Sequence, residues 1–214
     1  MSRNVSIIGG GVIGLVTGLS LARSTADSGT DYQVEIIEKE ERVGNQSTAV
    51  AGYGIRTVYR HPVNLYLAQK GLQFWSTLSE TSETGFRRNG YLFLTNDDEM
   101  SSTLQRERTR QISNGFPAEI RTPVDPGEFS TEEINRYRTG LFSPVSAVSD
   151  SARTIESIRH LCEQSGVRIR TGEEVTDIED EGTQCRLETT ESTEWADTVV
   201  NAAGVWADEI AQLT

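Results

Sequence analysis

Lysine, cysteine and histidine are scarce in this chain of 214 residues, which holds two of each. His61 and His160 lie far apart, and Cys162 and Cys185 form no CxxC pair. No spacing typical of a metal site is present, so no metal is expected. Two isolated thiols fit a reducing compartment, and we therefore expect a cytoplasmic protein without structural disulfides.

Long hydrophobic runs are also missing. The longest apolar stretch, Val5 to Leu21, is interrupted by five glycines and three hydroxyl residues. A membrane-spanning helix needs about 20 consecutive apolar residues, so no integral membrane segment is expected. The mixed polar run Arg23 to Asp27 that follows is not typical of an export signal.

The charge is strongly negative, with 32 acidic residues, 20 basic ones and a formal net charge of -12. Such a field repels phosphates, and no nucleic-acid partner is expected. The one basic stripe, Arg106, Arg108 and Arg110, is interrupted by Glu107. Two lysines against eighteen arginines favour a protein of a salt-loving cytoplasm. An ordinary acidic protein from a gene rich in G and C is the alternative.

The chain opens with a strand, a glycine turn, a helix and a second strand. Val5 to Ile8 is a short apolar run, Val12 to Ala26 has apolar residues at helical spacing, and Gln33 to Glu38 is strand-like. This order predicts a βαβ unit and a parallel sheet.

The middle of the chain has a different character. From Gly85 a strand (91–94), a charged surface helix (97–112) and a proline-containing stretch (116–149) indicate an excursion into a second domain. A further helix is expected to begin at Pro62. From Asp150 helices and strands again follow one another regularly. We expect a helix to about residue 164, strands at 167–170, 175–178, 185–187 and 198–201, and a helix from about residue 205.

The glycine turn satisfies the pattern GxGxxG through Gly9, Gly11 and Gly14, with Val12 and Ile13 between the last two. The pattern alone is weak, but here it follows a strand, opens a helix and precedes a strand that ends in an acid. Gly9 permits the tight turn, Gly11 lets a pyrophosphate approach the backbone, and Gly14 lets the helix pack closely on the sheet. The helix N-terminus then favours the phosphates.

Glu38 ends the second strand, where a carboxylate can accept hydrogen bonds from the adenosine ribose and repel a 2′-phosphate. NADP is therefore disfavoured, and Gly18 extends the pattern to a form more typical of FAD than of NAD. Lys39 is included among the candidate cofactor residues. For Lys39 and Arg42 a solvated surface charge is the alternative.

Three more segments carry recognisable motifs. Glu38 to Ala49 places Gly44, Ser47 and Thr48 after the second strand. Gly166 to Ile178 is a predicted strand pair with Val175 at the start of its second strand, and Val199 to Ala207 has the sequence VVNAAGVWA. In this order they resemble the D-amino-acid oxidase family of FAD-dependent oxidoreductases, which includes glycine and sarcosine oxidases.

The resemblance implies a role for each motif in binding FAD. Gly44, Ser47 and Thr48 would pass beside the pyrophosphate and flavin, and the Val175 backbone would face adenine. Small residues of the third motif would let a strand end approach the cofactor, with Trp206 covering the pyrophosphate. The positions concerned in that motif are Ala202, Ala203, Gly204 and Trp206.

The resemblance also implies the architecture: an α/β fold, with a Rossmann-like FAD-binding domain on a parallel sheet and part of a smaller α+β substrate domain. We expect the first at 1–84 and 148–214 and the second at 85–147. Members of the family are nearly twice as long, so the chain is expected to be a fragment or to be completed by a second chain or a missing carboxy-terminal half.

In that family the flavin accepts a hydride from a carbon beside nitrogen or oxygen. Gly54 to His61 resembles the stretch in which an arginine binds the substrate carboxylate; Arg60 aligns best and Arg56 is second, with a surface ion pair as the alternative for both. His61 could serve as a base, although a cap or packing role is the more common one. The substrate is expected to be an amino acid or related small amine acid. A 2-hydroxy acid, glycerol 3-phosphate, or a fragment that only binds nucleotide are the alternatives.

Overall fold

The computed structural model describes residues 2–24, 29–122 and 136–214. The chain divides into two compact units. The first unit is Met1–Ala51 with Ser151–Thr214, and the second unit is Gly52–Asp150. The expected domain boundaries at 84/85 and 147/148 remain a prediction.

A four-stranded parallel sheet forms the centre of the first unit, in the order β12-β1-β2-β8. Its strands are β1 (Ser2–Ile8), β2 (Asp31–Glu38), β8 (Arg168–Thr171) and β12 (Thr198–Asn201). Ile7 pairs in register with Ile36, and both side chains are fully buried. The parallel sheet and the α/β class expected from the sequence are thereby confirmed.

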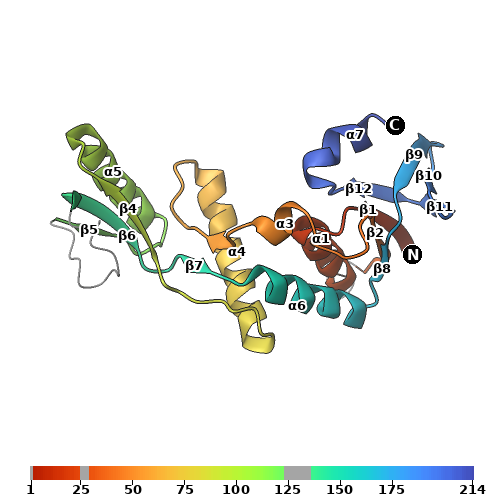
Figure 1. The fold of residues 1–214 in the computed structure, drawn as a ribbon, viewed down its shortest axis with the longest axis horizontal. Coiled ribbons are helices and arrows are strands. Elements are labelled where there is room, and N and C mark those ends of the chain that lie inside the picture. The colour runs from red at the N-terminus through yellow and green to blue at the C-terminus, as the bar shows by residue number, and fades with distance from the viewer. Residues whose placement is uncertain (1, 25–28, 123–135) are drawn as a thin grey trace. The chain divides into compact units, whose positions relative to one another are not determined.

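Two helices pack beside this sheet (Figure 1). They are α1 (Val12–Arg23) and α6 (Ser151–Gln164). An added Cβ at Gly18 of α1 would lie 3.0 Å from Cδ1 of Ile36, so the glycine allows α1 to approach the sheet closely. The Cys162 thiol of α6 donates to the Leu15 carbonyl oxygen of α1 at 3.2 Å, and burial raises the pKa of this thiol to about 11. The expected end of the first helix, at residue 26, lies outside the described residues.

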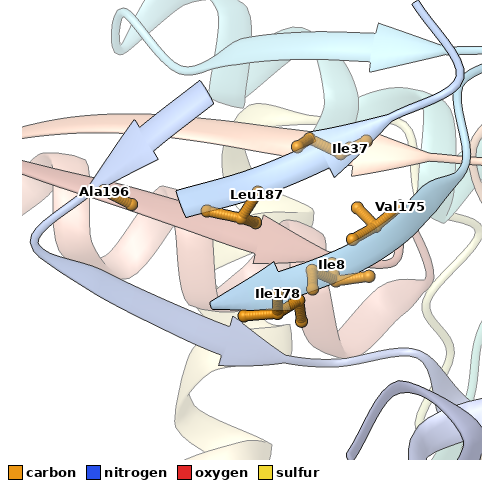
Figure 2. Close-up of a cluster of buried hydrophobic side chains, with 6 residues drawn as sticks. All are labelled: Ile8, Ile37, Val175, Ile178, Leu187 and Ala196. Carbon is orange, nitrogen blue, oxygen red and sulfur yellow. The ribbon is translucent and has the colours of Figure 1, made fainter. Parts of the chain in front are cut away.

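A second, antiparallel sheet is formed by the carboxyl-terminal part of the first unit. It contains β9 (Val175–Asp180), β10 (Cys185–Thr189) and β11 (Thr193–Ala196), in the order β11-β10-β9. Its apolar side chains pack against β1 and β2 in one cluster of Ile8, Ile37, Val175, Ile178, Leu187 and Ala196 (Figure 2). The described part of this unit also contains three short helices: α3 (Ser47–Val50), η3 (Gly204–Trp206) and α7 (Ala207–Ala211).

The second unit is built on an antiparallel sheet in the order β4-β6-β5. The sheet strands are β4 (Tyr91–Thr95), β5 (Glu119–Arg121) and β6 (Thr139–Ser143), with α5 (Asp98–Ser113) packed on them (Figure 1). Leu104 of α5, Ala118 and Leu141 form the local core. The unit also contains α4 (Pro62–Thr81) and a short pair of strands, β3 (Gly54–Ile55) and β7 (Ala147–Val148).

In the described ranges, no helix has both the length and the apolar composition needed to cross a bilayer. Within those same ranges, no three His, Cys, Asp or Glu side chains gather as a metal site would require.

Candidate functional site

Two positions of the turn between β1 and α1 accept no residue other than glycine. Gly9 has a φ of +109°, and an added Cβ there would lie 2.5 Å from the carbonyl oxygen of Ala202. A Cβ at Gly14 would lie 1.9 Å from the carbonyl oxygen of Gly9. Since real Cβ atoms do not approach so closely, the first glycine permits the tight turn and the third permits the helix to lie against it.

The N-terminus of α1 opens directly after this turn. Gly11 is the N-cap residue and has no capping side chain of its own. The cap is supplied by Thr48 of α3, whose Oγ1 accepts a hydrogen bond from the Val12 N–H at 3.2 Å. The Ile13 side chain is exposed. The first backbone N–H groups of a helix carry partial positive charge, so this end can receive an anionic group.

Glu38 is held beside the turn by two backbone amides. Its Oε2 accepts from the Gly10 N–H at 2.7 Å and its Oε1 from the Glu40 N–H at 2.9 Å. The residue is 9% exposed. A carboxylate offers about four acceptor positions, so two remain for other donors. The side chain is therefore fixed in place while still able to accept further hydrogen bonds.

Lys39 follows Glu38 at the end of β2, and its side chain contacts a residue that comes after β12, on the opposite side of β1. Its Nζ lies 3.9 Å from the ring centroid of Trp206 in η3. Such a distance is typical of a cation–π contact. Because β2 and β12 flank β1, this contact joins chain segments from both sides of the glycine turn.

The turn, Glu38 and the Lys39–Trp206 contact surround one cleft of the first unit. It holds about 780 Å³, open solvent at its mouth included. Twelve of the fifteen residues that the sequence assigns to the cofactor line it: Gly9, Gly11, Glu38, Lys39, Gly44, Ser47, Thr48, Val175, Ala202, Ala203, Gly204 and Trp206. Val12, Ile13 and Gly14 do not line it, nor does Arg42.

Nine lining residues were not predicted from the sequence: Ile8, Ile37, Asn45, Gln46, Glu173, Glu174, Val205, Glu209 and Ile210. Asn45, Gln46 and Val205 adjoin predicted positions, so the motifs already pointed to them. Glu209 and Ile210 belong to α7 and carry no motif of their own. Among the described residues that line the cleft, four are acidic and one, Lys39, is a cation. The helix N-terminus is therefore a major attraction for phosphate.

Glu173 forms part of the cleft wall and is held by a cluster of side chains. Arg170 pairs with it through two nitrogens and with Glu194 at 2.6 Å. Thr189 and Ser192 also donate to its carboxylate. Burial alone would raise the pKa of Glu173, but the hydrogen bonds from Thr189 and Arg170 and the charge of Arg170 hold it below the usual value. The Glu173 N–H donates to the Glu38 carbonyl oxygen at 3.0 Å, which ties the wall to the end of β2.

The three candidate catalytic residues belong to the second unit. The Arg60 side chain is 71% exposed, and its Nε lies 3.4 Å from Oε1 of Glu107. His61 is the N-cap of α4, with Nδ1 accepting from the Val63 N–H at 3.3 Å. Arg56 is exposed, and it forms no ion pair with the residues that the structure describes. Arg60 thus forms an ion pair, and His61 caps a helix. These are the alternative roles that the sequence left open for the two residues.

Comparison with known proteins identifies the family. The family described as FAD dependent oxidoreductase matches residues 4–214. The chain belongs to this family. It is 31% identical over 211 residues to glycerol 3-phosphate dehydrogenase from Caloramator mitchellensis, with 97% of this chain and 43% of the relative covered. It is 23% identical to L-2-hydroxyglutarate dehydrogenase from Indibacter alkaliphilus, with all of this chain and 53% of the relative covered.

Solved structures of similar proteins share the fold. L-proline dehydrogenase from P. horikoshii superposes with a TM-score of 0.88 at 25% identity, over 99% of this chain and 55% of that one. Glycine oxidase from Geobacillus kaustophilus gives a TM-score of 0.83 at 23% identity, over 99% and 58%. The chain therefore spans about half the length of the relatives it matches.

FAD is the cofactor of this family, and the cleft fits the ADP part of FAD. Gly9 and Gly11 leave the turn without side chains, and the N-terminus of α1 opens beside it. Glu38 keeps acceptor positions that suit ribose hydroxyls. Ile8, Ile37 and Val175 give the cleft an apolar part on which a base can lie.

Proposed function

We propose that the chain binds the ADP part of FAD in this cleft and forms part of an oxidoreductase acting on an amino acid or related small amine acid. One observation carries the proposal. The glycine turn, the helix N-terminus and the doubly anchored Glu38 lie around a single cleft, in a chain that belongs to the FAD-dependent oxidoreductases. The same contacts suit an unphosphorylated ribose, because Glu38 would repel a 2′-phosphate.

The residues of the cleft would each contact a different part of the bound FAD. The N-terminus of α1 stabilises the pyrophosphate, and Glu38 accepts from the ribose. Val175 would face adenine, and Trp206, in contact with Lys39, would cover the pyrophosphate. When bound, FAD supplies the acceptor for two electrons and a proton from a carbon that carries nitrogen or oxygen.

Arg60 is our candidate for binding the substrate carboxylate. Its guanidinium is exposed, and a planar fork can form two parallel charge-assisted hydrogen bonds to a carboxylate. Arg56 is the second candidate. His61 as a base is the least supported of the three roles, since its Nδ1 already caps α4.

A 2-hydroxy acid or glycerol 3-phosphate is the alternative substrate. The names of two relatives support it, glycerol 3-phosphate dehydrogenase and L-2-hydroxyglutarate dehydrogenase. Turnover in either case is proposed to require the further half that the relatives possess, on the same or a second chain. Without it the chain would act as a nucleotide-binding unit only. Its cytoplasmic location and its adaptation to salt stay predictions from composition.

The test has two parts. The purified chain is titrated with FAD and followed by quenching of flavin fluorescence, with FMN as the control that lacks the adenosine. Saturable binding of FAD but not FMN is expected, and equal binding of both would contradict the assignment of the cleft. The second part uses the protein completed by its further half, under anaerobic conditions. The flavin absorbance is followed after addition of an amino acid, an N-methyl amino acid, a 2-hydroxy acid or glycerol 3-phosphate. The compound that bleaches it identifies the substrate class.

A further inference from the structure

Four consecutive residues of the second unit, Thr57 to Arg60, lie in no helix or strand, yet each is held by a different contact. Thr57 is fully buried and its Oγ1 lies 2.8 Å from Ser143 Oγ and 3.0 Å from Ser146 Oγ. Val58 packs against the core of Leu104, Ala118 and Leu141. An irregular segment fixed at this many points has a defined conformation.

The last two residues of the segment are held by α5. Gln111, which is fully buried, donates from Nε2 to the Tyr59 carbonyl oxygen at 3.3 Å. Glu107, 6% exposed, contacts the Arg60 side chain at Nε. The inward face of α5 therefore carries a carboxylate and an amide where apolar residues would be the rule.

Both buried polar groups need an explanation. Oε1 of Gln111 has no hydrogen-bond partner among the described residues, an arrangement that costs free energy. Glu107 is neutralised by Arg110, whose Nη1 donates to both carboxylate oxygens at 2.8 and 3.0 Å. The same carboxylate also forms an ion pair with Arg60.

Contact at Nε has a consequence for the rest of the guanidinium. Among the described residues, Glu107 is the acid with which Arg60 forms an ion pair; the contact is at Nε, and the Arg60 side chain is 71% exposed. An arginine that is paired with a buried carboxylate, on a backbone that is itself fixed, has fewer side-chain orientations open to it. That arrangement suits an incoming carboxylate, because less side-chain entropy is lost on binding.

The geometry points to Glu107 and Gln111 as positioning residues that hold Arg60 ready for a carboxylate ligand. Glu107 orients the guanidinium and Gln111 fixes the backbone one residue earlier. This inference rests on the proposed role of Arg60 in binding the substrate carboxylate. It adds that the affinity depends on two residues of α5 that do not touch the ligand.

The test measures binding of propionate to the 214-residue chain with FAD added, by ¹⁵N NMR of the arginine side chains at constant ionic strength. Propionamide, which has the same shape without the charge, is the ligand control. The Arg60 signals are assigned from their loss in Arg60→Ala. Glu107→Gln keeps the side-chain size and removes the charge, and Glu99→Gln is the matched control because it removes an exposed acid from the same helix.

The sign of the change decides the outcome. If Glu107 acted only as a nearby negative charge, Glu107→Gln would tighten propionate binding. Positioning predicts the opposite, a loss of roughly three- to fivefold, the scale of one exposed ion pair, with a shift of the Arg60 Nε–H signal. Glu107→Asp should give an intermediate loss, and Glu99→Gln should bind as the parent does.

Gln111→Met provides a second variant that leaves every charge in place and fills the buried site with a side chain of similar length. We expect it to weaken propionate binding about twofold, the effect of one neutral hydrogen bond at the low end of its range. Tighter or unchanged binding in both Glu107→Gln and Gln111→Met, with binding lost in Arg60→Ala, would overturn the positioning role and leave the proposed function standing. Unchanged binding in Arg60→Ala would instead remove Arg60 from the proposed function.

Discussion

Oε2 of Glu38 accepts a hydrogen bond from the backbone N–H of Gly10 at 2.7 Å, which joins the end of β2 to the turn after β1. The two sites assigned to the nucleotide, the acid for the ribose and the glycines for the pyrophosphate, are thus parts of one hydrogen-bonded structure. A change at either is expected to affect the other.

Replacing Glu38 with alanine should weaken FAD binding by about 1.5–3 kcal/mol, the range for hydrogen bonds to a charged group. It should also reduce the preference for ADP over 2′-phospho-ADP, because the repelling charge is lost. Asp31→Ala, at the exposed opposite end of β2, is the control and should change neither quantity. A fluorescence titration with FAD, and displacement of the bound FAD by ADP or by 2′-phospho-ADP, measure the two effects. An unchanged affinity for FAD in Glu38→Ala would show that the acid serves only the turn.

Valine at Gly11 and valine at Gly14 should have different effects. A Cβ at Gly11 would meet only Thr48 Oγ1, at 3.2 Å, so the variant should fold with a loss of about 1 kcal/mol from the poorer N-cap. It should nevertheless not bind FAD, because the side chain occupies the space of the pyrophosphate. Gly14→Val should lower the free energy of unfolding by at least about 3 kcal/mol, since backbone lies 1.9 Å from the new Cβ. Urea unfolding and FAD titration separate the two cases, and FAD binding by Gly11→Val would exclude the fingerprint role.

Glu173 predicts a dependence of stability on pH. Its pKa is held below 4.5 in the folded protein, so its contribution is present above the unfolded-state pKa and is lost as pH falls through the lower folded value. Glu173→Gln should lose about 2 kcal/mol at pH 7, the scale of hydrogen bonds to a charged group. The difference from the parent should shrink below about pH 4.5. A difference that stays constant between pH 7 and pH 3 would show that the charge of Glu173 is not what stabilises the wall.

Composition predicts a response to salt. With thirty-two acids against twenty bases, the excess negative charges repel one another at low ionic strength. Molar salt shortens the Debye length to about 3 Å and screens this repulsion. The melting temperature should therefore rise as KCl is increased to molar concentration, while the same titration with sucrose separates screening from general preferential exclusion. A flat or falling Tm in KCl would favour the ordinary acidic protein.

The parts of the site that were predictable from sequence depend on short-range geometry. Gly9 and Gly14 are required by the turn itself, Gly11 leaves the space beside the helix N-terminus open, and Glu38 ends the strand that follows. The D-amino-acid oxidase motifs then predicted Val175, Ala202, Ala203, Gly204 and Trp206, which line the same cleft. These features need no knowledge of how distant surfaces pack.

Glu107 shows where the sequence was insufficient. In the sequence it only interrupts three arginines, and helical spacing suggests a surface position. The structure places it on the inward face of α5, between Arg110 and Arg60. Which face of a helix is buried depends on its tertiary partner, here a sheet whose strands are far apart in sequence. Glu173 is similar, because Thr189 and Ser192 reach it only through the pairing of β9 with β10.

The pairing of β1 with β12 also determines when the nucleotide cleft can form. Val5 lies opposite Thr198, and the Asn4 N–H donates to Asp197 across 193 residues. During synthesis β1 and β2 therefore emerge long before their outer neighbours, with both edges of the parallel pair unpaired. The whole second unit, Gly52–Asp150, is made in this interval. Folding of the first unit is consequently a late event of high contact order, and its early strands are the part of the nascent chain most in need of protection from aggregation.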